Sequence, residues 1–125
     1  MIAVDTSSFV AYLDGEKRPD TDAVEMALQQ KLVVFPPVVL TELLSDPKLP
    51  LSIKKTFQEI PILPTLEGYW ERAGLLRSKI LSHGCKARLA DTLITQSCLD
   101  HDIPLIAHDS DFRHFVQFAS LKRLV

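Results

Sequence analysis

Short apolar runs alternate with segments of helical periodicity along this chain. Residues 1–4, 32–35 and 105–107 are apolar runs of the length of buried strands, and 121–125 is expected as a last strand. Between them, apolar side chains recur every three or four residues, which predicts helices. The first expected helix can be capped by Thr6 or Ser7, and the second begins at Pro19–Asp20. Further helices are expected over 37–45, 52–57, 67–83 and around 90–97, and a last turn of helix at 111–115. Strands that alternate with helices predict an α/β fold with a mostly parallel sheet covered on both faces.

Prolines, glycines and capping residues place the ends of these elements. Asp20 is suited to cap its helix, Gly84 to end the longest helix, and Pro104 marks the turn before the strand 105–107. On or near one face of the longest helix the apolar residues are Trp70, Ala73, Leu76, Ile80 and Leu81. Residues 60–64 contain two prolines and are expected to be extended, as an edge strand.

The composition is that of one globular domain over residues 1–125. The chain has 125 residues, 46% of them hydrophobic and 24% charged, which is enough to bury a single core. No apolar run approaches the roughly 18 residues of a membrane span, and the N-terminus lacks a signal-peptide pattern. We therefore expect a soluble, cytoplasmic protein with no membrane partner. Cys85 and Cys98 form neither a disulfide framework nor a metal cluster, and we interpret them as small core residues.

Charge is distributed unevenly along the chain. The formal net charge of −2 argues against a protein that wraps nucleic acid over its whole surface. From 72 to 88 the chain nevertheless carries five basic residues and no acid. This segment predicts the solvated face of an amphipathic helix or, alternatively, a surface that steers phosphates. Asp100, His101 and Asp102 lie beside a proline and are interpreted as a solvated loop.

Carboxylates stand where predicted strands end or predicted helices begin. Asp5 follows the first strand, Asp109 follows the strand 105–107, and Asp91 lies in the first turn of its helix. Glu42 lies on the helix 37–45, where apolar neighbours indicate packing on two sides and make a charge conspicuous. Because the carboxyl ends of parallel strands share one edge, these side chains can converge there. Their repulsion is offset by a divalent cation, and oxygen ligands favour Mg²⁺ or Mn²⁺ over zinc.

Hydrolysis of a phosphodiester is the chemistry best served by such a site. A bound cation lowers the pKa of a water and steadies the leaving oxygen. Arg88, three residues before Asp91 on the helix, can contact a phosphate oxygen. The acids also have structural interpretations: Asp5 can cap a helix, Asp91 can complement the helix dipole, and Asp109 and Asp111 can form a cap or turn.

Four short motifs resemble those of the PIN domain family, in the same order. They are Val4-Asp5-Thr6-Ser7, Leu40-Thr41-Glu42-Leu43, Ala90-Asp91-Thr92-Leu93-Ile94 and Asp109-Ser110-Asp111-Phe112. The resemblance covers nearly the whole chain. In length and in the lack of appended domains, the chain looks most like VapC-type toxins of bacterial toxin–antitoxin pairs.

This resemblance implies an α/β/α sandwich that acts as a Mg²⁺- or Mn²⁺-dependent endoribonuclease. The implied catalytic and metal-binding quartet is Asp5, Glu42, Asp91 and Asp109. Ser7 would assist through its hydroxyl, and Asp111 would be an accessory metal-binding acid. An RNA substrate, a homodimer and inhibition by a VapB-type antitoxin are also implied. The chain departs from the family at Ala107, where members commonly carry Thr or Ser; this affects a supporting hydrogen bond and not the acid itself.

Other classes of protein share parts of this pattern. Haloacid-dehalogenase phosphatases also place an aspartate after the first strand, but they need a second one where Ser7 stands. Phosphorylated receivers use a paired acid near the N-terminus, which residues 1–6 lack. The third alternative is a PIN-like module that binds a metal or a partner without catalysis, and the presence of all four acids argues against it.

Overall fold

The computed structural model describes residues 1–108 and 110–125, and of Asp111 it describes the backbone alone. Within these residues four short strands form one sheet in which every pair is parallel. The sheet order is β2-β1-β3-β4, with β1 Ile2–Val4, β2 Val33–Val34, β3 Leu105–Ile106 and β4 Arg123–Leu124. The predicted parallel sheet is therefore confirmed, and the predicted strand positions contain the observed ones.

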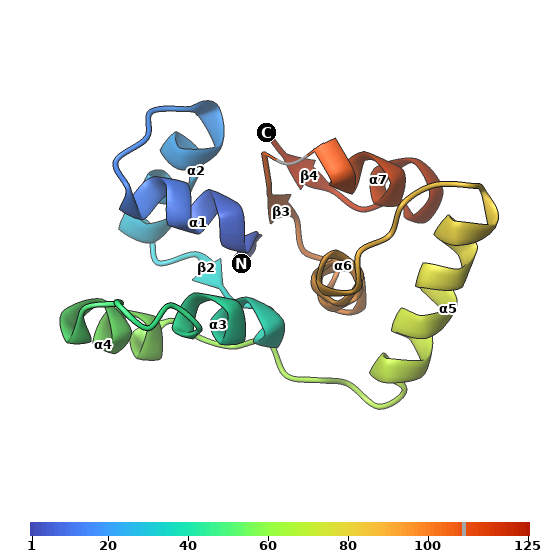
Figure 1. Ribbon diagram of the computed structural model, residues 1–125, viewed down its shortest axis with the longest axis horizontal. Coiled ribbons are helices and arrows are strands. Elements are labelled where there is room, and N and C mark those ends of the chain that lie inside the picture. The colour runs from blue at the N-terminus through green and yellow to red at the C-terminus, as the bar shows by residue number, and fades with distance from the viewer. Residues whose placement is uncertain (109) are drawn as a thin grey trace.

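Helices cover both faces of the sheet. They are α1 Thr6–Leu13, α2 Pro19–Gln29, α3 Pro37–Leu44, α4 Leu51–Glu59, α5 Tyr69–Ser82, α6 Leu89–His101, the 3-10 helix η1 Ser110–Phe112 and α7 Arg113–Ala119. Figure 1 shows α1 and α2 on one side of the sheet, α5, α6 and α7 on the other, and α3 with α4 along the side of β2. This confirms the predicted α/β class. No helix among the described residues has the length and apolar character needed to cross a membrane.

The strand register brings the segments after β1 and β3 together at the carboxyl edge. Val4 pairs with Ile106, and the backbone N–H of Asp5 donates to the Ile106 carbonyl at 2.9 Å. Asp5 thus lies beside the end of β3, and His108 follows that strand by two residues. In parallel sheets this edge is where sites are built, because loops of several strands meet there.

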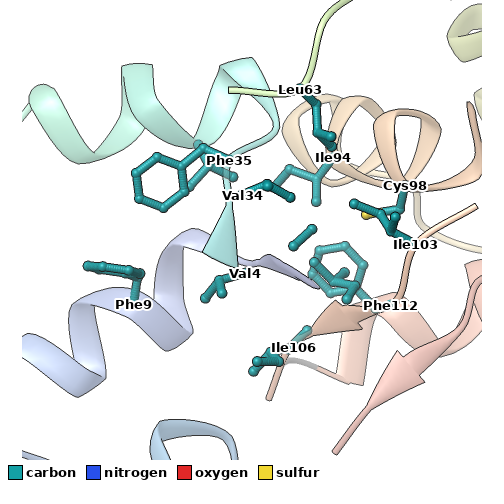
Figure 2. Close-up of a cluster of buried hydrophobic side chains, with 14 of the residues drawn as sticks. Val4, Phe9, Val34, Phe35, Leu63, Ile94, Cys98, Ile103, Ile106 and Phe112 are labelled. Carbon is teal, nitrogen blue, oxygen red and sulfur yellow. The ribbon is translucent and has the colours of Figure 1, made fainter. Parts of the chain in front are cut away.

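Buried apolar side chains on both sides of the strands form the core. Figure 2 shows Phe9 and Phe35 toward one end, Ile94, Cys98 and Phe112 toward the other, and Val4 and Val34 of the strands between them. On the first side, Phe57 of α4 joins Phe9 and Phe35 in an edge-to-face cluster with ring centroids 5.4 to 6.2 Å apart. Each such ring pair contributes about 0.5–1.5 kcal/mol beyond burial alone. The cluster ties α4 to α1 and to the end of β2.

The longest helix has a narrower buried face than its sequence predicts. Ala73, Leu76 and Ile80 are buried, whereas Trp70 is 65% exposed and Leu81 is 47% exposed. At 3.6 residues per turn, each residue is rotated about 100° from its neighbour, so one position beside the buried stripe already faces outward. Tyr69 takes the inward position instead, and its hydroxyl donates to the Leu93 carbonyl at 2.7 Å.

Three expected local features are also corrected by the structure. Helix α1 is capped by Asp5 in position, not by Thr6 or Ser7. Helix α2 begins after Arg18, and the hydroxyl of Thr21, not Asp20, bonds the backbone at its start. Residues 60–64 contribute a single parallel bridge, between Phe35 and Ile62. The side chain of Asp20 is instead buried, where it pairs with Arg18.

Candidate active site

A pocket of about 840 Å³ lies at the carboxyl edge of the sheet. Its walls come from α1, α3, the start of α6 and the segments that follow β1 and β3. All the predicted site residues whose side chains are described line it: Asp5, Ser7, Glu42, Arg88 and Asp91. Residues separated by more than eighty positions in sequence are therefore brought to one cavity.

Asp5 lies where β1 ends and α1 begins. Its backbone is extended (φ −69°, ψ 147°), as required of a residue that precedes a helix, yet its side chain makes no capping hydrogen bond. The Ser7 hydroxyl donates to Asp5 Oδ2 at 2.6 Å. This contact orients the carboxylate in the pocket, and the interpretation of the Asp5 side chain as a helix cap is wrong. The predicted assistance of Ser7 in catalysis stays a prediction.

Glu42 projects from the pocket side of α3. Helix α3 packs against α1 and α6, as the apolar pattern predicts, but the side chains of Glu42 and Leu44 are exposed. The Thr6 hydroxyl donates to Glu42 Oε1 at 2.6 Å. Consecutive residues at the start of α1 therefore orient two carboxylates from different elements, and Thr6 is a supporting residue that the sequence pattern did not single out.

Asp91 and Arg88 enter the pocket from the start of α6. Arg88 is the residue before the helix, and Asp91 lies in the first turn and is half-buried. A carboxylate here is favoured by the helix dipole, which accounts for its local stability. Its position in one pocket with Asp5 and Glu42 is an additional fact that the dipole does not explain.

Two predicted acids lie beyond what the structure describes. Asp109 is outside the described residues, and so is the side chain of Asp111. Their neighbours His108 and Ser110 line the pocket. The roles of Asp109 and Asp111 therefore stay predictions.

The chemistry of the pocket suits a hard cation. Its described acids offer carboxylate oxygens, with hydroxyls of Thr6 and Ser7 behind them, and this is the ligand type that Mg²⁺ and Mn²⁺ prefer. Among the described side chains, no group of three or more His, Cys, Asp or Glu is close enough to hold a metal ion. The oxygen donors are of the type that Mg²⁺ or Mn²⁺ binds. The described carboxylates line the pocket, but by themselves they are not close enough together to hold the ion.

Comparison with models of known protein families assigns the chain to one family. The model of the PIN domain matches residues 2–116. This chain belongs to the PIN domain family. PIN domains are generally nucleases.

Solved structures support the same fold. FitAcB from Neisseria gonorrhoeae is similar over 100% of this chain and 97% of its own, with 18% identity and a TM-score of 0.68. VapBC2 from Rickettsia felis, bound to a DNA fragment from its promoter, is similar over 99% of this chain and 98% of its own, with 16% identity and a TM-score of 0.73. FitAB bound to an IR36 DNA fragment is similar over 99% and 94%, with 19% identity and a TM-score of 0.74. We found no match among curated proteins.

An ion pair on the pocket wall of this PIN domain was missed at the level of sequence. Asp20, only 1% exposed, accepts hydrogen bonds from Arg18 Nε at 3.0 Å and Arg18 Nη2 at 2.9 Å, and from the Ser8 hydroxyl at 2.8 Å. Burial by itself raises the pKa of Asp20, but the hydrogen bonds from Arg18 and Ser8 hold it below its ordinary value. Only the proximity of Arg18 to Asp20 in sequence hinted at the pair.

A second buried ion pair corrects the interpretation of the far end of α6. Asp100 is not in a solvated loop: its side chain is 8% exposed and receives Arg72 Nη2 at 2.7 Å, Arg72 Nε at 3.0 Å and the Gln96 amide at 2.8 Å. Burial opposes ionisation, yet the hydrogen bonds from Arg72 and Gln96 lower the pKa of Asp100. Asp102 is exposed and pairs with Lys122 at 2.9 Å, as a solvated position would.

Two of the five basic residues in the segment 72–88 make hydrogen bonds that join parts of the fold. Arg72 is held by Asp100, and Arg77 Nε donates to the Ala87 carbonyl at 2.8 Å. Of its basic residues, Arg88 lines the pocket. Lys79, Lys86 and Arg88 are the exposed basic residues of this segment, and its role in steering phosphates stays a prediction.

Proposed function

We propose that this PIN domain is a Mg²⁺- or Mn²⁺-dependent endoribonuclease that hydrolyses RNA phosphodiester bonds. One observation carries the proposal: Asp5 after β1, Glu42 of α3 and Asp91 of α6 line one pocket at the carboxyl edge of a parallel sheet. Such a concentration of like charge is unfavourable by itself and is offset by a cation. The family, whose members are generally nucleases, supports the same chemistry.

The proposal gives each pocket residue a role. Asp5, Glu42, Asp91 and Asp109 would hold the cation as the catalytic quartet, with Asp111 as an accessory acid. When bound, the cation lowers the pKa of a water and stabilises charge on the phosphate oxygens. Ser7 and Thr6 keep the Asp5 and Glu42 carboxylates oriented through their 2.6 Å hydrogen bonds. Arg88 contacts a phosphate oxygen of the RNA.

A place in a toxin–antitoxin pair extends the proposal. The similar structures include VapBC2 of Rickettsia felis and FitAB, each described as a complex bound to DNA. By analogy, this chain is the toxin of a VapBC-type pair, acts in the cytoplasm as a homodimer, and is inhibited by a small VapB-type antitoxin. A short gene beside its own that encodes a DNA-binding protein, and copurification of that protein, would test this part separately.

The decisive experiment is cleavage of a labelled RNA pool by purified protein with Mg²⁺ or Mn²⁺, with a chelator as the blank. Asp5→Asn and Asp91→Asn should abolish the metal-dependent products. Asp102→Asn is the matched control, because Asp102 is an exposed acid away from the pocket, with φ of 50°, a conformation that asparagine tolerates. Equal cleavage by the wild type and both pocket variants would contradict the assignment.

The same experiment separates the alternative of a non-catalytic PIN-like module. That module would bind Mn²⁺, visible as a higher melting temperature, and yet release no products from any RNA in the pool. Loss of the Mn²⁺ effect in Asp91→Asn would then assign the pocket to metal binding alone.

A further inference from the structure

We propose that Arg18 contacts a phosphate of the RNA backbone in the pocket and that Asp20 is the positioning residue that holds it there. This inference rests on the proposed ribonuclease function and adds to it a substrate contact outside the acidic quartet. It begins from one observation: Arg18, on the loop between α1 and α2, lines the same pocket as Asp5, Glu42 and Asp91.

The guanidinium of Arg18 is fixed in place. Asp20 binds it through two parallel hydrogen bonds of 3.0 and 2.9 Å, and Glu16 lies 3.2 Å from Nη1. A bidentate contact of this kind sets the plane as well as the position of the group. Arginine has five N–H donors, so the two given to Asp20 leave others for a ligand. The side chain remains 30% exposed and is therefore accessible from the pocket.

Asp20 is itself built into the fold. It is almost fully buried, and Ser8 on α1 donates to it at 2.8 Å, while His108, after β3, lies 3.8 Å away on the pocket wall. A buried carboxylate is costly unless it is paired and hydrogen-bonded. Arg18 and Ser8 together offset that cost, and the pairing with Asp20 keeps Arg18 beside the pocket.

The charges of the pocket give Arg18 a reason to be there. Its acids include Asp14 and Glu16 as well as the three carboxylates of the proposed site, and these would repel an RNA backbone. Cations on the wall are needed to bring phosphates in, and Arg18 and Arg88 lie on it. Because Arg18 comes from the α1–α2 side and Arg88 from the start of α6, the two can contact different phosphates of one strand.

A second arginine–aspartate pair in the same molecule serves as a control for the Arg18–Asp20 pair. Arg72 and Asp100 form a pair with nearly the same distances, 3.0 and 2.7 Å, and a third donor, Gln96, in the place of Ser8. That pair joins α5 to the end of α6 and does not line the pocket. If bidentate pairing serves only the fold, the two pairs are equivalent; if Arg18 binds substrate, they differ in RNA kinetics.

The test compares the double variants R18Q/D20N and R72Q/D100N, each of which removes both charges so that no buried charge is left alone. Steady-state cleavage of a short labelled RNA is measured with Mn²⁺. R18Q/D20N should raise KM by roughly tenfold, the loss expected for one charge-assisted hydrogen bond, while changing kcat by less than about threefold. R72Q/D100N should leave KM unchanged. The single variant R18K, which keeps a cation without the fork, should give an intermediate KM and serves if a double variant fails to fold.

A second readout distinguishes a phosphate contact from general destabilisation. RNA binding is measured over a range of salt concentrations in the D91N background, where cleavage is disabled. Adding R18Q/D20N should lower the slope of log affinity against log salt by about 0.7, the loss of one contact to single-stranded RNA, and adding R72Q/D100N should not. R18K should retain the wild-type slope.

The outcomes separate the two proposals. Unchanged KM and salt slope in R18Q/D20N, in a protein that cleaves RNA, would overturn the role of Arg18 and leave the ribonuclease assignment standing. Equal losses in both double variants, in proportion to their melting temperatures, would also overturn it. Absence of cleavage by the wild type would overturn the ribonuclease assignment, and the inference about Arg18 with it.

Discussion

The first and last turns of α6 each carry an aspartate, and the two have opposite surroundings. Asp91 faces the pocket that Asp5 and Glu42 also line. Asp100, nine residues later and about 13 Å along the helix, is enclosed by Arg72 and Gln96. The Asp100 carboxylate is held by a bidentate guanidinium that joins α5 to α6, whereas the Asp91 carboxylate lies in a pocket with other acids. Residue type is the same at both ends, so location decides the role.

The largest expected effect is on RNA cleavage. Asp91→Asn should reduce the metal-dependent rate by roughly a hundredfold or more, since even supporting residues at metal sites cost 10–100-fold. Asp100→Asn should leave the rate per folded molecule near that of the wild type. Cleavage assays normalised to the folded fraction measure this, and a comparable loss in both variants would erase the functional difference between the two ends of α6.

The next effect is on the free energy of unfolding, where Asp100→Asn should have a larger effect than Asp91→Asn. Asp100→Asn should lower the free energy of unfolding by about 1.5–3 kcal/mol, because the buried hydrogen bonds to a charged Arg72 are weakened. Asp91→Asn, without metal, should leave stability unchanged or raise it by relieving repulsion among the pocket acids. Urea titrations in a chelator are the measurement. A strongly destabilised Asp91→Asn would mean that Asp91 is a structural residue.

Acid should remove the stabilising contribution of Asp100 in a defined direction. The folded-state pKa of Asp100 is lowered from 3.8, so its contribution is fully present above that value and is lost as the pH falls through the folded pKa. The stability difference between the wild type and Asp100→Asn should therefore be constant from pH 7 to about pH 5 and shrink below about pH 4. Melting temperatures in a chelator across this range check it; a difference that grows in acid would contradict the pairing.

The smallest effect concerns the two thiols, of which Cys98 lies near the far end of α6 and Cys85 lies in the segment between α5 and α6. Cys98 is buried in the core, and burial raises the pKa of its thiol to about 12, whereas Cys85 is only partly buried. A thiol reagent at pH 8 should modify Cys85 in the native protein and leave Cys98 unmodified. Mass spectrometry of the labelled protein, with Cys85→Ser as the control, reads this out. Rapid labelling of Cys98 would show that this end of α6 opens, and would contradict the view that the Arg72–Asp100 pair holds it closed.

Local pattern predicted most of the fold and part of the site. The apolar runs lie at the observed strands, and helical spacing placed α3 and α5 within a residue or two. Asp5 and Asp91 were found because they stand at the end of a strand and at the start of a helix, positions that a parallel sheet brings to one edge. Glu42 was singled out because its apolar neighbours predict packing of α3 on two sides; α3 does pack against α1 and α6, while the Glu42 side chain itself is exposed in the pocket.

The features that failed depend on contacts between distant elements. Nothing in the neighbourhood of Asp20 distinguishes a capping residue from a buried partner of Arg18, because Ser8 of α1 and His108 after β3 complete its surroundings. Asp100 appeared solvated in sequence, since its partner Arg72 lies twenty-eight residues earlier on α5. Trp70 was placed on or near the apolar face of α5, but in the folded protein it is exposed, and the neighbouring Tyr69 is buried instead.

The sequence by itself determined the α/β class, the elements and the candidates for chemistry, because periodicity, proline and glycine stops and helix starts are properties of neighbouring residues. Tertiary structure alone decided the strand order β2-β1-β3-β4 and the grouping of Asp5, Glu42 and Asp91 in one pocket. It also decided which aspartates are paired with arginine. The physical reason is that burial and ion pairing depend on which distant surfaces meet, and that information is not carried by any single segment.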